Sequence, residues 1–125
     1  MLTIAVCDDN PQFANQLIKK IRELCAYHLP DRIDCRMAPA FGSGEDVLRY
    51  VKSHVINIMF LDIDMPKING FRLASELKEK TPDTIIIFVS AYDDFVYSSF
   101  EYAPFRFLRK SHLEEELPEL SSVGC

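Results

Sequence analysis

The chain lacks an excess of positive charge: its net charge is −5 at neutral pH. Recognition of nucleic acid phosphates needs a basic surface, so we expect no nucleic acid binding by this domain itself. No apolar run approaches the roughly 18 residues that span a membrane. No charged segment leads into an apolar one at the start, as in a secretory signal peptide. These absences predict a cytoplasmic protein with no membrane association.

The four cysteines form no C-x-x-C pair and no zinc-ligand spacing. Cys7 lies in an apolar run and is interpreted as a small buried hydrophobic residue. His28, His54 and His112 have no partners at ligand or catalytic spacing, so they are expected at the surface. With 125 residues, of which 48% are hydrophobic, the chain suits one compact domain over residues 1–125.

Apolar runs of strand length alternate with segments of helical periodicity along the whole chain. Strands are expected at Leu2–Cys7, Ile33–Ala38, Ile56–Leu61, Thr84–Val89 and Phe105–Arg109. Helices are expected from Asn10-Pro11 to before Pro30, after the cap Ser43, across Phe71–Leu77, across Asp93–Tyr102 and from a capping box at Ser111. This alternation predicts a doubly wound five-stranded parallel sheet with helices on both faces, in the flavodoxin-like order 2-1-3-4-5. The second strand is the more polar and is expected near an edge. The last helix is short, which suggests a piece of a longer protein.

Polar residues follow four of these strands, at the edge where parallel sheets hold their binding sites. Asp8 and Asp9 follow the first strand, Asp62 the third, Ser90 the fourth and Lys110 the fifth. Clustered carboxylates repel one another unless a cation joins them, and Mg²⁺ needs one or two carboxylates plus waters. Carboxylates, a magnesium ion, a lysine and a hydroxyl together can stabilise a transferring phosphoryl group, with Asp62 as the nucleophile.

Each of these residues also has a structural explanation. Asp8 and Asp9 can cap the following helix, whose dipole favours acidic residues. Ser90 can be an N-cap, and Lys110 a solvated charge. The conjunction of four strands that deliver compatible groups to one edge is what makes the prediction specific.

The segments around these residues resemble the receiver domain of two-component response regulators over nearly the whole chain. The resemblance rests on Cys7-Asp8-Asp9-Asn10, Phe60-Leu61-Asp62-Ile63-Asp64-Met65-Pro66, Gly70, Val89-Ser90-Ala91 and Lys110. It implies that a sensor histidine kinase phosphorylates Asp62. It also implies that the domain is no enzyme toward other substrates, although it catalyses its own phosphorylation and dephosphorylation.

The resemblance also implies a role for each site residue. Asp9 and Asp62 bind Mg²⁺ directly, together with the backbone carbonyl of Asp64, whereas Asp8 acts mostly through water. Ser90 and Lys110 bind the phosphoryl oxygens. Phe107 matches the switch aromatic, which rotates inward as Ser90 moves.

The chain is further similar to the subgroup of regulators that carry a LytTR-type DNA-binding domain. The signs are the extra length before the second strand and the stretch Phe105–Lys110. One departure from the family is Ser111, where a proline, often with a cis bond, usually follows the lysine. A cis bond before a residue other than proline costs about 2.5–4 kcal/mol, which argues against that geometry unless the surroundings enforce it.

Aromatic residues are concentrated near the end of the chain, where eight of the 14 lie between positions 88 and 107: Phe88, Tyr92, Phe95, Tyr97, Phe100, Tyr102, Phe105 and Phe107. About half are expected in the core. The others are expected on the face formed by the fourth helix, fifth strand and fifth helix, since aromatic residues are enriched at interfaces. The resemblance implies that this face forms a homodimer on phosphorylation.

Two alternatives remain open at this point. A haloacid-dehalogenase-type phosphohydrolase also uses an Asp-x-Asp, which Asp62 and Asp64 fit, but its acidic pair comes later in the chain and it needs a cap. A pseudo-receiver would keep the fold without the phosphate, which the complete residue set argues against.

Overall fold

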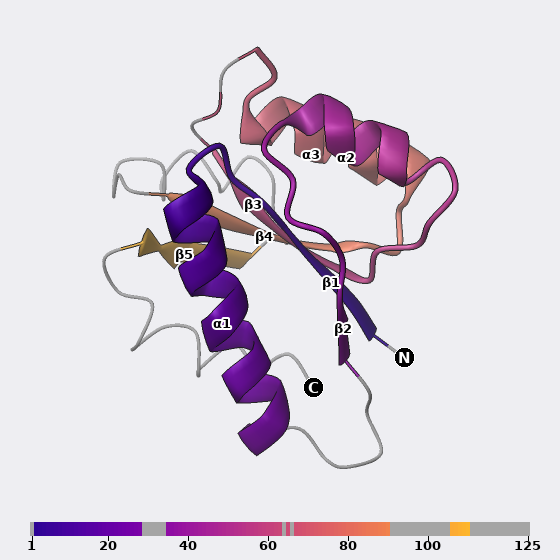
Figure 1. The fold of residues 1–125 in the computed structure, drawn as a ribbon. Coiled ribbons are helices and arrows are strands. Elements are labelled where there is room, and N and C mark those ends of the chain that lie inside the picture. The colour runs from indigo at the N-terminus through magenta and orange to yellow at the C-terminus, as the bar shows by residue number, and fades with distance from the viewer. Residues whose placement is uncertain (1, 29–34, 64, 66, 91–105, 111–125) are drawn as a thin grey trace.

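A computed structural model describes residues 2–28, 35–63, 65, 67–90 and 106–110. Five parallel strands form one sheet in the order β2-β1-β3-β4-β5 (Figure 1). They are β1 (Leu2–Cys7), β2 (Cys35–Met37), β3 (Ile58–Asp62), β4 (Ile85–Ser90) and β5 (Arg106–Arg109). The predicted flavodoxin-like order is therefore confirmed, with β2 at an edge as expected.

Helices cover both faces of the sheet. Helix α1 (Pro11–His28) packs on one face, and helices α2 (Gly44–Tyr50) and α3 (Gly70–Lys80) lie together on the other (Figure 1). Alternate residues of β1 serve the two faces, as the period of two in a strand requires. Ile4 and Val6 belong to the apolar cluster under α1, whereas Ala5 and Cys7 belong to the cluster under α2 and α3.

Short polar side chains start the three helices. Asn10 Oδ1 accepts hydrogen bonds from the backbone N–H groups of Gln12 and Phe13, at 3.1 and 3.3 Å. Ser43 Oγ accepts one from Asp46 at 3.3 Å, as predicted. Asn69 Oδ1 accepts one from Arg72 at 2.9 Å. Each cap accepts hydrogen bonds from backbone N–H groups that the first helical turn leaves unsatisfied. The caps therefore determine where the preceding loops end and the helices begin.

The strand boundaries differ from the prediction by one or two residues. The third strand begins at Ile58 rather than Ile56, because Asn57 is occupied at the opposite end of the sheet. Its side chain accepts a hydrogen bond from Thr3 N at 2.8 Å, and its backbone N–H donates to Thr3 O at 2.9 Å. The strand extends instead through Asp62. The predicted helix at 93–102 and the capping box at Ser111 lie outside the described residues.

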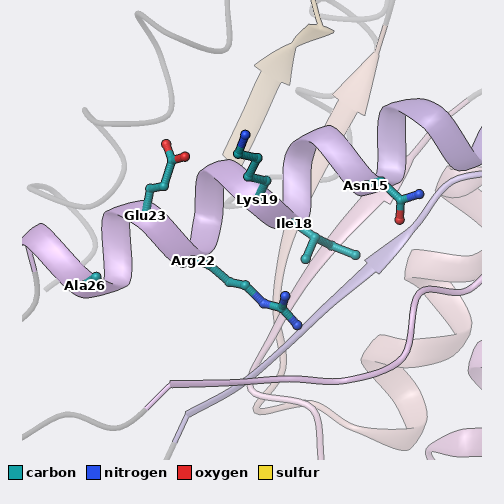
Figure 2. Close-up of a pocket in the computed structure, with 6 residues that line it drawn as sticks. All are labelled: Asn15, Ile18, Lys19, Arg22, Glu23 and Ala26. Carbon is teal, nitrogen blue, oxygen red and sulfur yellow. The ribbon is translucent and has the colours of Figure 1, made fainter.

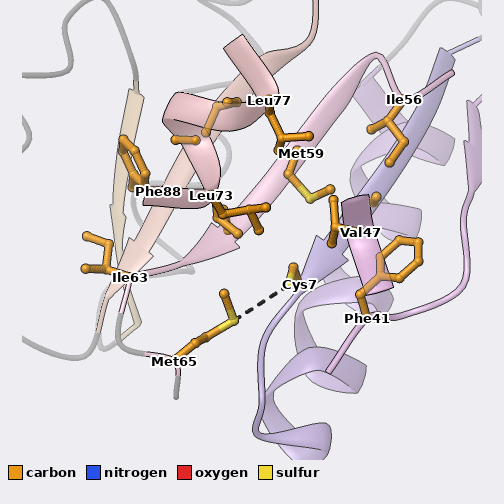
Figure 3. Close-up of a cluster of buried hydrophobic side chains, with 14 of the residues drawn as sticks. Cys7, Phe41, Val47, Ile56, Met59, Ile63, Met65, Leu73, Leu77 and Phe88 are labelled. Atoms are coloured by element: carbon orange, nitrogen blue, oxygen red, sulfur yellow. Dashed lines mark hydrogen bonds between the residues drawn. The ribbon is translucent and has the colours of Figure 1, made fainter. Parts of the chain in front are cut away.

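The larger apolar cluster lies between the sheet and helices α2 and α3, and reaches the edge where Asp62 lies. Figure 3 shows it, with Cys7 and Met65 at the end nearest the loop after β3. Phe71 stacks edge to face on Phe88, with ring centroids 5.0 Å apart. The end of β3 is therefore anchored on its apolar side, while its last residue carries a carboxylate.

Candidate functional site

Three carboxylates meet at the carboxyl edge of the sheet because β1 and β3 are neighbours. Cys7 pairs with Leu61, so Asp8 and Asp62 are the next residues along two adjacent strands. Oxygen atoms of Asp8, Asp9 and Asp62 lie within 4.8 Å of one another. Asp8 and Asp62 are each 3% exposed, whereas Asp9 is exposed. The structure thus brings together the three acidic residues that the sequence singled out.

Asp8 is held in place from both its backbone and its side chain. Its N–H donates to Phe41 O at 2.9 Å, and its Oδ1 accepts from Asn10 N at 2.8 Å. Oδ2 is buried and makes no hydrogen bond within the part of the chain that the structure describes. One oxygen of Asp8 therefore orders the turn that leads into α1, whereas the helix itself is capped by Asn10, and the other oxygen of Asp8 faces the acidic site.

Lys110 brings a positive charge from the end of β5 to this site. Its Nζ lies 2.9 Å from Asp8 Oδ2 and 3.7 Å from Asp62 Oδ1. The contact between Lys110 Nζ and Asp8 Oδ2 is an ion pair, although its angles do not fit a hydrogen bond. The lysine side chain is 19% exposed, so water screens its attraction to the carboxylates less than it screens an ion pair on the surface. The explanation of Lys110 as a solvated charge is therefore wrong.

The ring of Phe13 forms the apolar side of the lysine pocket. Lys110 Nζ lies 4.4 Å from the ring centroid, a distance at which the negative face of the ring attracts a cation. Phe13 also packs against the apolar cluster under α1. The sequence predicted only that Phe13 lies in the first helix, because helical periodicity gives no information about contacts to a distant strand.

The donor set fits a hard divalent cation. Three carboxylates and one ammonium leave an excess of negative charge, and two of the carboxylates are buried. Asp8 Oδ2, which is ion-paired with Lys110 but makes no hydrogen bond among the described residues, adds a further possible ligand atom. Such all-oxygen sites suit Mg²⁺, which keeps several of its waters.

Gly70 is required by close contact with the backbone of Asp62. A Cβ atom at Gly70 would lie 2.4 Å from Asp62 O and 2.7 Å from Ile63 Cα. The N–H of Gly70 donates to Ile63 O at 2.9 Å. The loop between β3 and α3 includes Lys67 at a positive φ of 65°, and it folds back so tightly that no side chain fits. In the sequence Gly70 was only part of a family pattern, and the packing supplies the physical reason for a glycine there.

Cys7 lies directly before the acidic pair but has no thiolate character. Burial, followed by the charges of Asp8 and Asp62, raises the pKa of the Cys7 thiol to about 12. The protonated Sγ donates to the Met65 thioether at 3.6 Å (Figure 3). The interpretation of Cys7 as a small buried residue is confirmed, since the side chain is 0% exposed.

The remaining predicted site residues are described only through their backbone, or lie outside the described residues. Ser90 ends β4 and pairs with Arg109, one position beyond the pairing of Asp62 with Val89. Its backbone is therefore at the same edge as Asp62. Phe107 pairs with Phe88, two positions before Ser90. Asp64 lies outside the described residues, as does Ser111. His54 is exposed, as predicted, whereas the side chain of His28 and all of His112 lie outside the described part.

A separate depression runs along the outer side of α1, away from the acidic edge. Figure 2 shows its lining residues, which all belong to α1: Asn15, Ile18, Lys19, Arg22, Glu23 and Ala26. Its charges are mixed, and most of its side chains are exposed. It contains none of the acidic residues of the site. Among the described residues, no helix combines the length and apolar character needed to cross a membrane.

The fold and the site together define a flavodoxin-like α/β protein with an acidic, lysine-bearing pocket at the carboxyl edge of its sheet. The family model of the response regulator receiver domain matches residues 4–121, and the chain belongs to this family. It is the receiver domain of a two-component response regulator, so the resemblance is confirmed and the phosphohydrolase alternative gains no support.

Named relatives agree with this assignment. The chain is 27% identical over 118 residues to the positive alginate biosynthesis regulatory protein of Pseudomonas aeruginosa, covering 94% of this chain and 45% of that protein. It is 33% identical over 96 residues to the sensory transduction protein LytT of Oceanobacillus iheyensis, covering 75% of this chain and 39% of that protein. The chain thus spans less than half of the length of either relative.

A solved structure is similar over its whole length. The response regulator protein TrrA of Thermotoga maritima, crystallised in complex with Mg²⁺-BeF, superimposes with a TM-score of 0.76 at 28% identity. The match covers 98% of each chain. The fold is therefore that of a known receiver, including the arrangement of elements that carries the acidic edge.

Proposed function

We propose that Asp62 accepts a phosphoryl group from a sensor histidine kinase in a magnesium-dependent reaction. The observation that carries this proposal is the position of Asp62. It is 3% exposed at the end of β3, with two further carboxylates within 4.8 Å and Lys110 Nζ 3.7 Å from its Oδ1. A buried carboxylate beside an ammonium group and a possible Mg²⁺ site is suited to act as the nucleophile, because these cations stabilise the negative charge on the phosphoryl oxygens.

In the proposed reaction a carboxylate oxygen of Asp62 forms a bond to phosphorus. The bond from phosphorus to the histidine nitrogen of the kinase breaks, and its electron pair stays on that nitrogen. A bound Mg²⁺ supplies charge neutralisation for the phosphoryl oxygens. In this proposal Asp9 and Asp62 would hold the cation directly, together with the carbonyl oxygen of Asp64, and Asp8 would act through water. Support comes from TrrA, a relative of 28% identity that was crystallised with Mg²⁺-BeF.

Lys110 and Ser90 are proposed to bind the oxygens of the transferred group. Lys110 needs little movement for this role, because its ammonium already lies between Asp8 and Asp62. Ser90 belongs to the strand beside β3, and its backbone ends at the same edge. The same groups serve hydrolysis of the acyl phosphate, so the domain governs its own dephosphorylation without acting on other substrates.

The output is proposed to be a dimer and a change in transcription. Movement of Ser90 and rotation of Phe107 would carry the signal to the face of the predicted fourth helix, β5 and the predicted fifth helix, on which about half of the aromatic residues between 88 and 107 are expected. A LytTR-type DNA-binding domain would then act on the genes. The names of the two relatives, a regulatory protein of alginate biosynthesis and LytT, support a regulator of this kind. This proposal places the protein in the cytoplasm.

The test is phosphorylation of the purified chain by acetyl phosphate with Mg²⁺, followed by intact mass spectrometry. Wild-type protein is expected to gain one hydroxylamine-labile phosphoryl group, which EDTA prevents. Asp62→Asn is the matched variant, equal in size, and is expected to gain none, with its melting curve as the control for folding. Failure of the wild-type protein to acquire this phosphoryl group would contradict the proposal and favour a pseudo-receiver. Steady hydrolysis of a phosphate ester, lost in Asp64→Asn, would instead favour the phosphohydrolase.

A further inference from the structure

A buried aromatic ring anchors the loop that joins β2 to α2 beside the acidic edge. Residues 39, 40 and 42 of this loop are exposed. Phe41, by contrast, is 7% exposed, and its ring belongs to the larger apolar cluster together with Cys7 of β1 and Val47 of α2 (Figure 3). Because surface loops have few packing contacts of their own, the buried ring of Phe41 determines where this loop lies.

The backbone of Phe41 holds the end of β1 in place. Its carbonyl oxygen accepts a hydrogen bond from the N–H of Asp8 at 2.9 Å, and its own N–H donates to Val6 O at 3.0 Å. Phe41 is also the parallel bridge partner of Cys7, so it continues the pairing along β1 beyond the end of β2. The position of Asp8, whose carboxylate lies in the acidic site, therefore depends on the position of Phe41.

The ring of Phe41 is supported in turn by Tyr50, the last residue of α2. The two rings pack edge to face, with centroids 5.1 Å apart and planes at 63°. The Tyr50 ring is also stacked on the ring of His54, with centroids 4.1 Å apart and planes at 11°. The backbone N–H of His54 donates to Tyr50 O at 3.0 Å, which orders the turn that carries the histidine. Because two rings contact Tyr50, its side chain has little freedom to move away from Phe41.

Helix α2 can support the ring of Phe41 because the helix is itself fixed to the sheet. Val47, in the middle of the helix, is 0% exposed within the apolar cluster. Ser43, which caps the helix, is only two residues after Phe41 in the chain. Direct contacts therefore lead from Tyr50 through Phe41 to the backbone of Asp8. If these rings only filled the core, their loss would lower stability and leave the acidic site unchanged.

We propose that Phe41, supported by Tyr50, is a positioning residue that holds Asp8 in place for magnesium binding. This inference rests on the proposed function, in which Asp8 acts on the cation through water. Residues behind the ligands of a metal ion commonly change its affinity about 10–100-fold when they are substituted, because they fix the direction of the ligand atoms. Tyr50 is one contact further from the site than Phe41, so its loss should weaken Mg²⁺ binding by the lower figure, about 10-fold.

The experiment substitutes the partly buried Tyr50, since the loss of the buried Phe41 ring would itself cost much stability. In Tyr50→Leu, titration calorimetry should give a dissociation constant for Mg²⁺ about 10-fold above that of wild type. The Mg²⁺ concentration for half-maximal phosphorylation by acetyl phosphate should rise by the same factor. The rate at saturating Mg²⁺ should stay close to that of wild type, because Asp62 and Lys110 are unchanged. Tyr50→Phe keeps the ring and should retain the wild-type affinity.

Hydrogen exchange supplies a second measurement, which needs no Mg²⁺. In metal-free Tyr50→Leu, the amide of Asp8 should exchange about 10-fold faster than in wild type, relative to the amide of Met59 in the central strand β3. The reason is that the acceptor of the Asp8 N–H is the carbonyl oxygen of Phe41, which the substitution releases. The ratio of the two rates removes the effect of a general loss of stability.

Ile21→Val is the matched control for stability, because Ile21 is buried under α1 on the opposite face of the sheet. It should lower the melting midpoint without changing the Mg²⁺ affinity or the relative exchange rate of the Asp8 amide. Equal Mg²⁺ affinity of Tyr50→Leu and Ile21→Val, or an unchanged Asp8 amide in Tyr50→Leu, would overturn the inference. Wild-type protein that binds no Mg²⁺ would overturn the proposed function instead, and exchange at Asp8 alone would then decide whether Tyr50 holds that residue.

Discussion

The ammonium group of Lys110 lies 4.4 Å from the centre of the Phe13 ring, although the two residues are at opposite ends of the chain. The same nitrogen is 2.9 Å from Asp8 Oδ2. Phe13 is in the first turn of α1 and Lys110 follows β5, so the contact spans the sheet edge above the site. The ring and the carboxylates together restrict the lysine to the mouth of the acidic pocket, where it can meet a phosphoryl group.

Phe13→Leu should slow phosphorylation of Asp62 by acetyl phosphate about 2–30-fold, since the loss of a cation–ring contact is worth about 0.5–2 kcal/mol. Phe13→Tyr keeps the ring and should retain most of the rate. The measurement is the initial rate of phosphoprotein formation at fixed Mg²⁺. Melting curves of both variants serve as the control for folding. If the two variants lose the same amount of activity, the ring has no role beyond packing.

Lys110→Met should have opposite effects on magnesium binding and on phosphorylation. The substitution removes the positive charge of Lys110 from beside the three carboxylates. The affinity of the site for Mg²⁺ should therefore rise about 3–10-fold. Phosphorylation should become much slower, because the charge that meets the phosphoryl oxygens is gone. Titration calorimetry gives the first quantity and intact mass the second. Lys67→Met, at an exposed loop position, is the control and should change neither. Weaker magnesium binding in Lys110→Met would contradict the arrangement of charges described above.

Gly70→Ala should lower the free energy of unfolding by about 1–3 kcal/mol and reduce phosphorylation. The added methyl group would lie 2.4 Å from the carbonyl oxygen of Asp62, so the phosphoacceptor itself must shift. Gly42→Ala is a matched control, since its Cβ would meet nothing within 4 Å. That variant should stay within about 0.5 kcal/mol of wild type in urea unfolding. Equal stability of the two variants would show that the loop relaxes without disturbing Asp62.

Cys7→Ala should change the dependence of stability on alkaline pH. The pKa of Cys7 rises from 9.0 in the unfolded chain to about 12 in the folded one. The folded state therefore holds a proton that the unfolded state has lost, and the free energy of unfolding falls as pH rises through this interval. The contribution is complete below about pH 9 and is lost by about pH 12, at about 1.4 kcal/mol per pH unit. The difference between wild type and Cys7→Ala removes the effects of lysine, tyrosine and Cys25, which both proteins share. Parallel curves would contradict the prediction.

The fold could be predicted from the sequence because each element carries a local pattern. The β-branched run Ile85–Ile87 and the apolar run at Ile4–Val6 are typical of buried strands, and their alternation with helical periodicity leaves few topologies. The helix starts could be predicted to within one or two residues of their observed positions, from Asn10 and Pro11 for α1 and from Ser43 for α2. The start of the third strand was harder to predict, because the pairing of Asn57 with Thr3 depends on a contact between distant segments.

The composition of the site was also determined by the sequence. Asp8, Asp9, Asp62 and Lys110 each follow a strand, and parallel strands end at one edge, so residue order alone predicted that they would meet. What the tertiary structure decided is how they meet. It turned Asp8 Oδ1 toward α1 and Oδ2 toward Lys110, placed Phe13 under the ammonium, and brought Gly70 against the carbonyl of Asp62. Periodicity constrains which face of its own element a residue occupies, whereas contacts between elements depend on packing in three dimensions, which no local pattern encodes.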